Sequence, residues 1–229
     1  MTTLAEHPLV CAICGRESLH YLAASPNIVE PPDFDTRPGE TLRSTLPAWV
    51  VECPHCGYAA ADLSVADARA SAIVRGEEYQ HRRADPALPE TARRFAAHAF
   101  LLERIGECAD AGWTALHAAW MCDDLAHPGA ARHCRSEAIR LWKRAKAQGE
   151  DFMEDLAQEF ALVTDLLRRM GDFDAAREAC LEALTLEDLP AMIDDMLRRQ
   201  LTLIQQKDTA AHSLKELERP RPGQRVTLN

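Results

Sequence analysis

The chain carries two Cys-x-x-Cys-Gly turns, and paired thiols at this spacing are typical ligands of a soft metal ion. The turns read CAICG at residues 11–15 and CPHCG at residues 53–57. Two such turns that face each other supply four thiolates to one tetrahedral ion at about 2.3 Å. The glycine after each pair permits the positive φ that the turn requires. The sequence therefore predicts one metal site, with the ligands Cys11, Cys14, Cys53 and Cys56.

Zinc is the ion that we expect at this site, in a structural role. Iron in the same four-thiolate cage is an alternative, because the doubled turn also resembles that of rubredoxin. Thiol redox chemistry is a third interpretation, but a thioredoxin-like site needs one Cys-x-x-Cys inside a βαβ unit, and the sequence near Cys11 and Cys53 supplies none. A closed four-thiolate site has no open position for water, so the ion would stabilise the fold. His7, His20 and His55 are near enough in sequence to replace a cysteine ligand.

The first 60 residues hold too few apolar side chains for a core of their own, which is a second reason to expect a metal there. Short strands should flank the two turns, and AWVV at residues 48–51 is the best candidate because aromatic and β-branched residues lead into Cys53. The apolar anchors of this region are Leu9 and Val10, residues 19–22, Ile28 and Val29, Leu46, and residues 49–51.

Between the two turns lies EPPDFDTRPGE, at residues 30–40. Its three prolines and its glycine predict a loop, since neither a helix nor a strand ladder tolerates so many breakers. One interpretation is a solvated acidic loop. The other is a recognition loop in which Asp33, Asp35 and Arg37 contact a partner or a second cation, because long irregular insertions are often functional.

From Ser64 onward the apolar residues recur at steps of three and four, which is the period of amphipathic helices. Ser64 with Asp67 predicts a helix that ends near Arg75, and the polar, proline-containing residues 78–89 predict a loop. A series of antiparallel helical hairpins should follow. Its predicted helices are residues 89–106, 107–125, 129–149, 151–171 and 172–186.

The run from Phe160 to Pro190 resembles a tetratricopeptide repeat. Gly171 lies in the turn, and the small residues Ala176 and Ala183 stand where paired helices approach closely. Residues 92–124 match the same pattern more loosely. The resemblance implies helix pairs that stack into a curved body with a groove.

Taken whole, the chain also resembles an uncharacterised bacterial family that joins paired Cys-x-x-Cys knuckles to tetratricopeptide-like helices. This resemblance rests on residues 11–15, 33–38, 53–60 and 118–120. It implies the fold and the metal site but no activity.

The predicted architecture is therefore mainly α, with tetratricopeptide-like antiparallel hairpins and a small zinc-ribbon-like head of strands and irregular chain. The predicted parts are a zinc-knuckle head at residues 1–63, a capping helix and linker at 64–88, a helical body at 89–206 and a C-terminal extension at 207–229. Part of this extension, ERPRPGQRVTLN at residues 218–229, is expected to be disordered and is a candidate linear interaction peptide.

Two further groups of residues admit a structural and a functional interpretation. Cys122, His127, His133 and Cys134 lie around one turn and could form a second metal site, although cysteine is often a small buried hydrophobe and histidine often ends helices. The tryptophans at positions 113, 120 and 142 are expected in the core rather than in a ligand cage.

The net charge and the motifs of the chain exclude several classes of function. The 36 acids against 26 Lys and Arg give a net charge of −10, which argues against binding the nucleic-acid backbone. No apolar run approaches the roughly 18 residues of a membrane span, so we expect a cytoplasmic protein. A phosphate-binding Gly-rich loop, a nucleophile elbow and an HExxH motif are all missing from the sequence, so an enzyme is not expected. The leading hypothesis for the function is a protein-interaction module whose helical groove binds a protein or peptide. The alternatives are a zinc-ribbon nucleic-acid or transcription-associated factor and a thiol redox protein.

Overall fold

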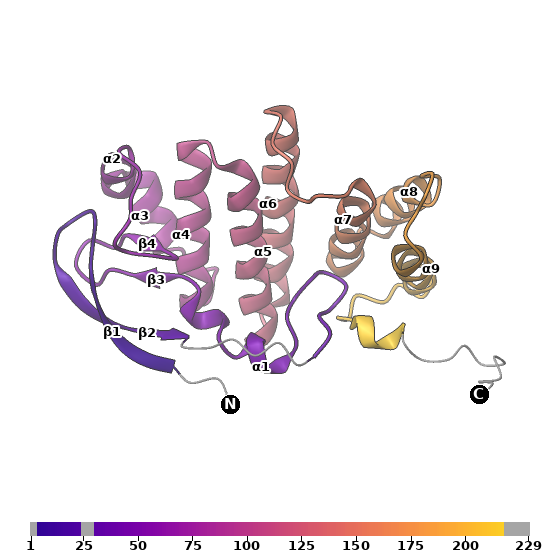
Figure 1. The fold of residues 1–229 in the computed structure, drawn as a ribbon, viewed down its shortest axis with the longest axis horizontal. Helices are drawn as coiled ribbons and strands as arrows, with labels where there is room; N and C mark the ends of the chain where they lie inside the picture. The colour runs from indigo at the N-terminus through magenta and orange to yellow at the C-terminus, as the bar shows by residue number, and fades with distance from the viewer. Residues whose placement is uncertain (1–3, 24–29, 218–229) are drawn as a thin grey trace. The chain divides into compact units, whose positions relative to one another are not determined.

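The computed structural model describes residues 4–23 and 30–217, shown as a ribbon in Figure 1. The chain divides into two compact units, of which the first comprises residues 1–27 and 40–154 and the second residues 28–39 and 155–229. Residues 30–39, which lie within the predicted knuckle head at residues 1–63, thus belong to the second unit. Ile28, Val29 and the predicted disordered peptide at residues 218–229 lie outside the described residues.

The first unit begins with two small antiparallel ribbons, one beside each cysteine turn. Strands β1 (Leu4–Val10) and β2 (Glu17–Ala23) pair on either side of the first turn, and β3 (Val51–Glu52) and β4 (Ala59–Ala60) pair on either side of the second. This confirms the expectation of strands that flank the knuckles. The predicted strand at residues 48–51 is wrong in its bounds, because Pro47 favours the 3₁₀ turn at Leu46–Ala48 and the strand begins only at Val51.

The helices α1 (Glu40–Arg43), α2 (Ala70–Arg75) and α3 (Glu77–Arg83) are short. The helix predicted to start at Ser64 starts at Ala70, because the Ser64 N–H and Oγ both donate to Asp62 Oδ1, at 2.8 and 2.7 Å, in a local turn. The loop predicted at residues 78–89 is wrong over its first part, where α3 forms and buries the Tyr79 ring completely.

Three long helices form the rest of the first unit, and they agree with the sequence pattern to within two residues. They are α4 (Glu90–Ile105), α5 (Cys108–Asp124) and α6 (Pro128–Ala147), with α5 packed against both α4 and α6 (Figure 1). Gly112 allows the close approach of α5 and α6, since a Cβ at that position would lie 2.2 Å from Trp142 Nε1. Trp120 and Trp142 are buried, as predicted, and Trp113 is partly buried with its Nε1–H donating to the Phe152 carbonyl at 3.0 Å.

The second unit contains the helices α7 (Leu156–Met170), α8 (Phe173–Ala183) and α9 (Ala191–Gln205). α7 starts later than the predicted residue 151, because Asp155 caps it by accepting from the Ala157 N–H at 2.6 Å. α7 and α8 form the predicted hairpin about Gly171, and α9 packs against both. Ala176 and Ala183 are fully buried, whereas the tetratricopeptide-like arrangement of the hairpins stays a prediction.

Two partly buried histidines join the head to α4 and α5 inside the first unit. The His117 ring lies among Trp49, Phe95 and Trp120, with ring centroids 5.2, 6.2 and 4.7 Å away. His98 forms a hydrogen bond with the backbone of Ala59 in β4. Burial lowers the pKa of each histidine to about 4, so both are neutral in the folded chain at physiological pH.

Because the pKa of both histidines is lowered in the folded chain, we predict that the chain is less stable in mild acid. Unfolded histidine has a pKa of 6.5, so between pH 6.5 and about 4 the unfolded chain binds protons that the folded chain excludes. The free energy of unfolding should fall by up to about 3 kcal/mol per histidine over this range. In His117→Phe, which preserves the ring packing, urea unfolding should show a shallower decline with pH than in the wild type.

His133→Gln is the matched control, since His133 is exposed. Comparison at each pH removes the effect of acid on any bound metal, which is common to all three proteins. Identical pH slopes in the wild type and His117→Phe would contradict the assignment of a neutral, buried imidazole.

Candidate metal centre

The four cysteines predicted as ligands come together in the first unit. Their Sγ atoms all lie within 4.8 Å of one another, with Cys11 and Cys56 separated by 3.6 Å and Cys14 and Cys53 by 3.7 Å. Four thiolates at about 2.3 Å from a tetrahedral ion stand about 3.8 Å apart. The sulfur atoms therefore already have the spacing of a four-thiolate site, whereas a disulfide would need about 2.05 Å.

The two cysteine turns, knuckle 1 (residues 11–15) and knuckle 2 (residues 53–57), share one backbone design. In each, the N–H of the first cysteine donates to the carbonyl of the residue after the glycine, at 3.0 and 2.8 Å. The glycine N–H donates back to the carbonyl of that cysteine, at 2.8 and 2.9 Å. The glycines have φ values of 68° and 77°, in the region that a side chain disfavours. The same loop is thus built twice, and each copy presents two sulfur atoms.

Hydrogen bonds between segments hold the knuckles in place. The Ala12 N–H donates to the Leu63 carbonyl at 2.7 Å, and His55 Nε2–H donates to the Glu17 carbonyl at 3.3 Å. His20 bonds to the Ser18 hydroxyl at 2.8 Å, and His7 is exposed on β1. Within residues 4–23 and 30–217, the cluster contains cysteines alone, so the three histidines considered as replacement ligands lie outside it.

Side chains of helix α3 form hydrogen bonds and contacts with knuckle 2 and the strands beside it. The buried Tyr79 hydroxyl donates to the Gly57 carbonyl and accepts from the Ala59 N–H, both at 2.9 Å. Arg83 Nε–H donates to Glu52 at 2.9 Å, and its side chain passes so close to Gly57 that a Cβ there would lie 2.5 Å from Nε. The sequence pattern did not predict this support, because residues 78–83 of α3 fell within the predicted loop at 78–89. The available signal was Tyr79 and Arg83 at an i, i+4 spacing.

The electrostatics of the cluster favour a cation. Burial raises the pKa of the Cys11 and Cys56 thiols, whereas a hydrogen bond from the backbone of Arg16 lowers the pKa of Cys14. Four thiolates in one small volume repel one another, and a metal ion that replaces their protons relieves this repulsion. Both zinc and iron take such a sulfur donor set, so the choice of zinc stays a prediction.

The second metal site considered from sequence is wrong. Among the residues that the structure describes, the four-cysteine group is the one set that lies within metal-binding distance. Cys122 and Cys134 are buried and hydrogen-bond to each other, while His127 and His133 are exposed. The thiols therefore pack as small core residues between α5 and α6, as does Cys108 in α5.

The prediction of a solvated acidic loop at residues 30–40 is wrong, because side chains in the middle of this loop are buried. Phe34, Asp35 and Arg37 are buried, with exposed fractions of 2%, 0% and 2%. Asp35 forms a buried ion pair with Arg169 of α7. The loop is therefore part of the core of the second unit.

Backbone contacts fix the loop on the C-terminal segment of the same unit. The Phe34 N–H donates to the His212 carbonyl at 2.8 Å, and the Leu214 N–H donates to the Pro32 carbonyl at 2.9 Å. Arg168 extends the network, because its Nη groups donate to the carbonyls of Asp208 and Ala210 at 2.8 and 2.9 Å. Neighbouring arginines of α7 thus hold both the loop and residues 208–214.

Comparison of the chain with protein-family models, with curated proteins and with solved structures found no match. The resemblances drawn from the sequence therefore stay predictions. Among the described helices, each is too short or too polar to cross a lipid bilayer.

The first prediction from this geometry concerns metal content. Elemental analysis of protein purified without added metal should find about one zinc per chain, and Cys53→Ser should lose it because three thiolates hold the ion far less tightly. Cys108→Ser is the control, since Cys108 is equally buried but lies outside the cluster. Metal-free wild type with an intact fold would contradict the site. Iron in place of zinc would contradict the assignment of the metal, but the four cysteines would still be its ligands.

The second prediction compares the two knuckle glycines. Gly15→Ala should reduce the free energy of unfolding of the metal-loaded chain by about 1–2 kcal/mol, the cost of a side chain at positive φ. Gly57→Ala should cost about 0.2–1 kcal/mol more, since its Cβ also displaces Arg83 from its ion pair with Glu52, whereas a Cβ at Gly15 meets open space. Urea unfolding measures both. Equal losses would show that Arg83 does not fix knuckle 2.

Proposed function

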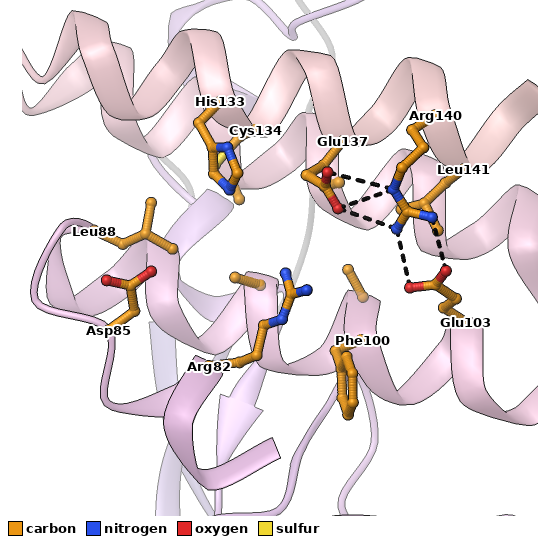
Figure 2. A pocket seen from close by; sticks show the side chains of 14 residues that line it. Arg82, Asp85, Leu88, Phe100, Glu103, His133, Cys134, Glu137, Arg140 and Leu141 are labelled. Atoms are coloured by element: carbon orange, nitrogen blue, oxygen red, sulfur yellow. Dashed lines mark hydrogen bonds and ion pairs between the residues drawn. The ribbon is translucent and has the colours of Figure 1, made fainter. Parts of the chain in front are cut away.

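We propose that this chain is a zinc-stabilised interaction protein whose first unit binds a protein or peptide partner in a groove on α4, α5 and α6. The observation that carries the proposal is a cavity on this face. Its lining includes Ala115 and Ala118 of α5. Leu88, Phe100 and Leu141 also line it (Figure 2).

The size of the cavity favours a side chain as its occupant. Its volume is about 40 Å³, while a single water needs about 10–15 Å³ and small-molecule sites span about 300–1,000 Å³. A cofactor does not fit in this space. An apolar side chain inserted from a peptide or a protein loop does, and insertion into a small apolar pocket is how anchor residues bind.

The rim of the cavity is charged and of mixed sign. Arg140 of α6 donates to both oxygens of Glu103 of α4 at 2.8 and 3.0 Å, and to Glu137 at 3.0 Å, as the dashed lines in Figure 2 show. Arg82 lies over the Phe100 ring at 5.4 Å. An apolar centre with a polar rim is the usual anatomy of a protein interface.

Charge supports a protein partner over a nucleic acid. The chain has a net charge of −10, which opposes binding to a phosphate backbone. Within this proposal the metal has a structural role, because four thiolates close its coordination shell. The tetratricopeptide-like stacking and the cytoplasmic location belong to the same proposal.

A random-peptide display library selected on the full metal-loaded chain tests this function. Selection should enrich peptides that share an apolar anchor residue. These peptides should lose affinity for Ala96→Phe, in which the new ring fills the cavity from its α4 wall. Ala147→Phe, at an exposed position near the end of α6, is the control and should bind like the wild type. Failure to enrich a common anchor, or binding that Ala96→Phe leaves unchanged, would contradict the proposal.

A further inference from the structure

A second and larger cavity lies beside the metal centre in the first unit. It is lined by Glu52 and Pro54 around Cys53, by Arg83 and Ala84 at the end of α3, and by Glu90, Arg93 and Arg94 at the start of α4. Its volume is about 540 Å³, which falls within the range of about 300–1,000 Å³ that small-molecule sites occupy. This cavity plays no part in the proposed groove.

Among the arginines that line this cavity, Arg83 forms an ion pair with a carboxylate, whereas Arg93 and Arg94 form none with the residues that the structure describes. Glu52 is bound by Arg83, whose Nη1 also donates to Gln80 at 3.2 Å. Arg93 uses only its Nε–H, which donates to the Leu88 carbonyl at 2.9 Å. Arg94 is partly buried, and within the described part of the chain its guanidinium has neither a hydrogen bond nor an ion pair. The Nη groups of Arg93 and the whole guanidinium of Arg94 are therefore available to a ligand.

Three arginines line this cavity against two glutamates, Glu52 and Glu90, so the lining carries an excess of positive charge that a bound anion would neutralise. Arginine is also the side chain whose planar fork matches the two oxygens of a carboxylate or phosphate. A local excess of positive charge is notable in a chain whose net charge is −10. We propose that this cavity binds an oxyanionic group, a phosphate or a carboxylate, through Arg93 and Arg94.

The remaining lining residues add two properties to the site. Glu90 contributes a carboxylate, so a ligand that carries a hydroxyl or amine donor beside its anionic group matches the cavity better than a bare anion. Glu52 and Pro54 flank the ligand Cys53, and Arg83 packs on Gly57 of knuckle 2. One wall of the anion site is therefore shaped by the metal centre, and the site should form fully only in the metal-loaded chain.

Isothermal titration calorimetry of the full metal-loaded chain tests the proposal, with inorganic phosphate and succinate as probes at constant ionic strength. At least one of the two should give saturable binding of about one anion per chain. Arg94→Gln should weaken that binding by about tenfold or more, because a charge-assisted bond is lost. Arg94→Lys should restore part of the affinity but not all, since lysine keeps the charge and lacks the fork.

Arg132→Gln is the control, because Arg132 is exposed on α6 and does not line the cavity. Each variant is first checked for metal content and helicity, so that a folding defect is distinguished from loss of the site. Binding of phosphate alone identifies a phosphate-bearing ligand, binding of succinate alone a carboxylate ligand, and binding of both a general oxyanion site. Failure of both probes to saturate at about 10 mM, or equal weakening by Arg94→Gln and Arg132→Gln, overturns the proposal.

Discussion

Four thiol groups within 4.8 Å of one another place a strong constraint on the first unit. Cys14 and Cys53 are 39 positions apart in the sequence, and bringing them together costs the conformational entropy of the intervening chain. A metal ion bound by all four sulfur atoms would offset this cost, for which the few apolar residues of the head are too small a core. The positive φ of both knuckle glycines, the Tyr79 hydrogen bonds and the position of Arg83 against Gly57 are all found around this cluster.

The chain between Cys14 and Cys53 includes residues 30–39, which belong to the second unit. Residues 30–39 leave the head between the two knuckles, and their Asp35 pairs with Arg169 of α7. Removing one partner of a buried ion pair costs about 3–5 kcal/mol, because the other charge is left without compensation. The segment between the two cysteine turns therefore contributes Asp35 to a buried ion pair of the second unit.

Local patterns predicted much of this structure. The Cys-x-x-Cys-Gly motif contains its own turn geometry, so the ligands were recognisable without the fold. The helices α4 to α8 follow from apolar residues at steps of three and four together with glycine at the turns. Features that depend on distant contacts were not predictable in this way. Asp35 looked like a solvated acid because its partner lies 134 positions away. Helix α3 looked like a loop because its residues are mostly polar and are followed by Pro86 and Pro89, which outweighed the i, i+4 spacing of Tyr79 and Arg83.

The central claim is that a metal ion bound by the four cysteines holds the two knuckles together. Hydrogen–deuterium exchange of the full chain, compared between the metal-loaded form and the form after chelation, tests this most directly. The claim predicts that protection of the backbone amides of Cys11, Gly15, Cys53 and Gly57 is lost on metal removal. The amides in the middle of α5 should stay protected, because that helix is packed between α4 and α6. Unchanged exchange at the knuckle amides after complete metal removal would contradict the account.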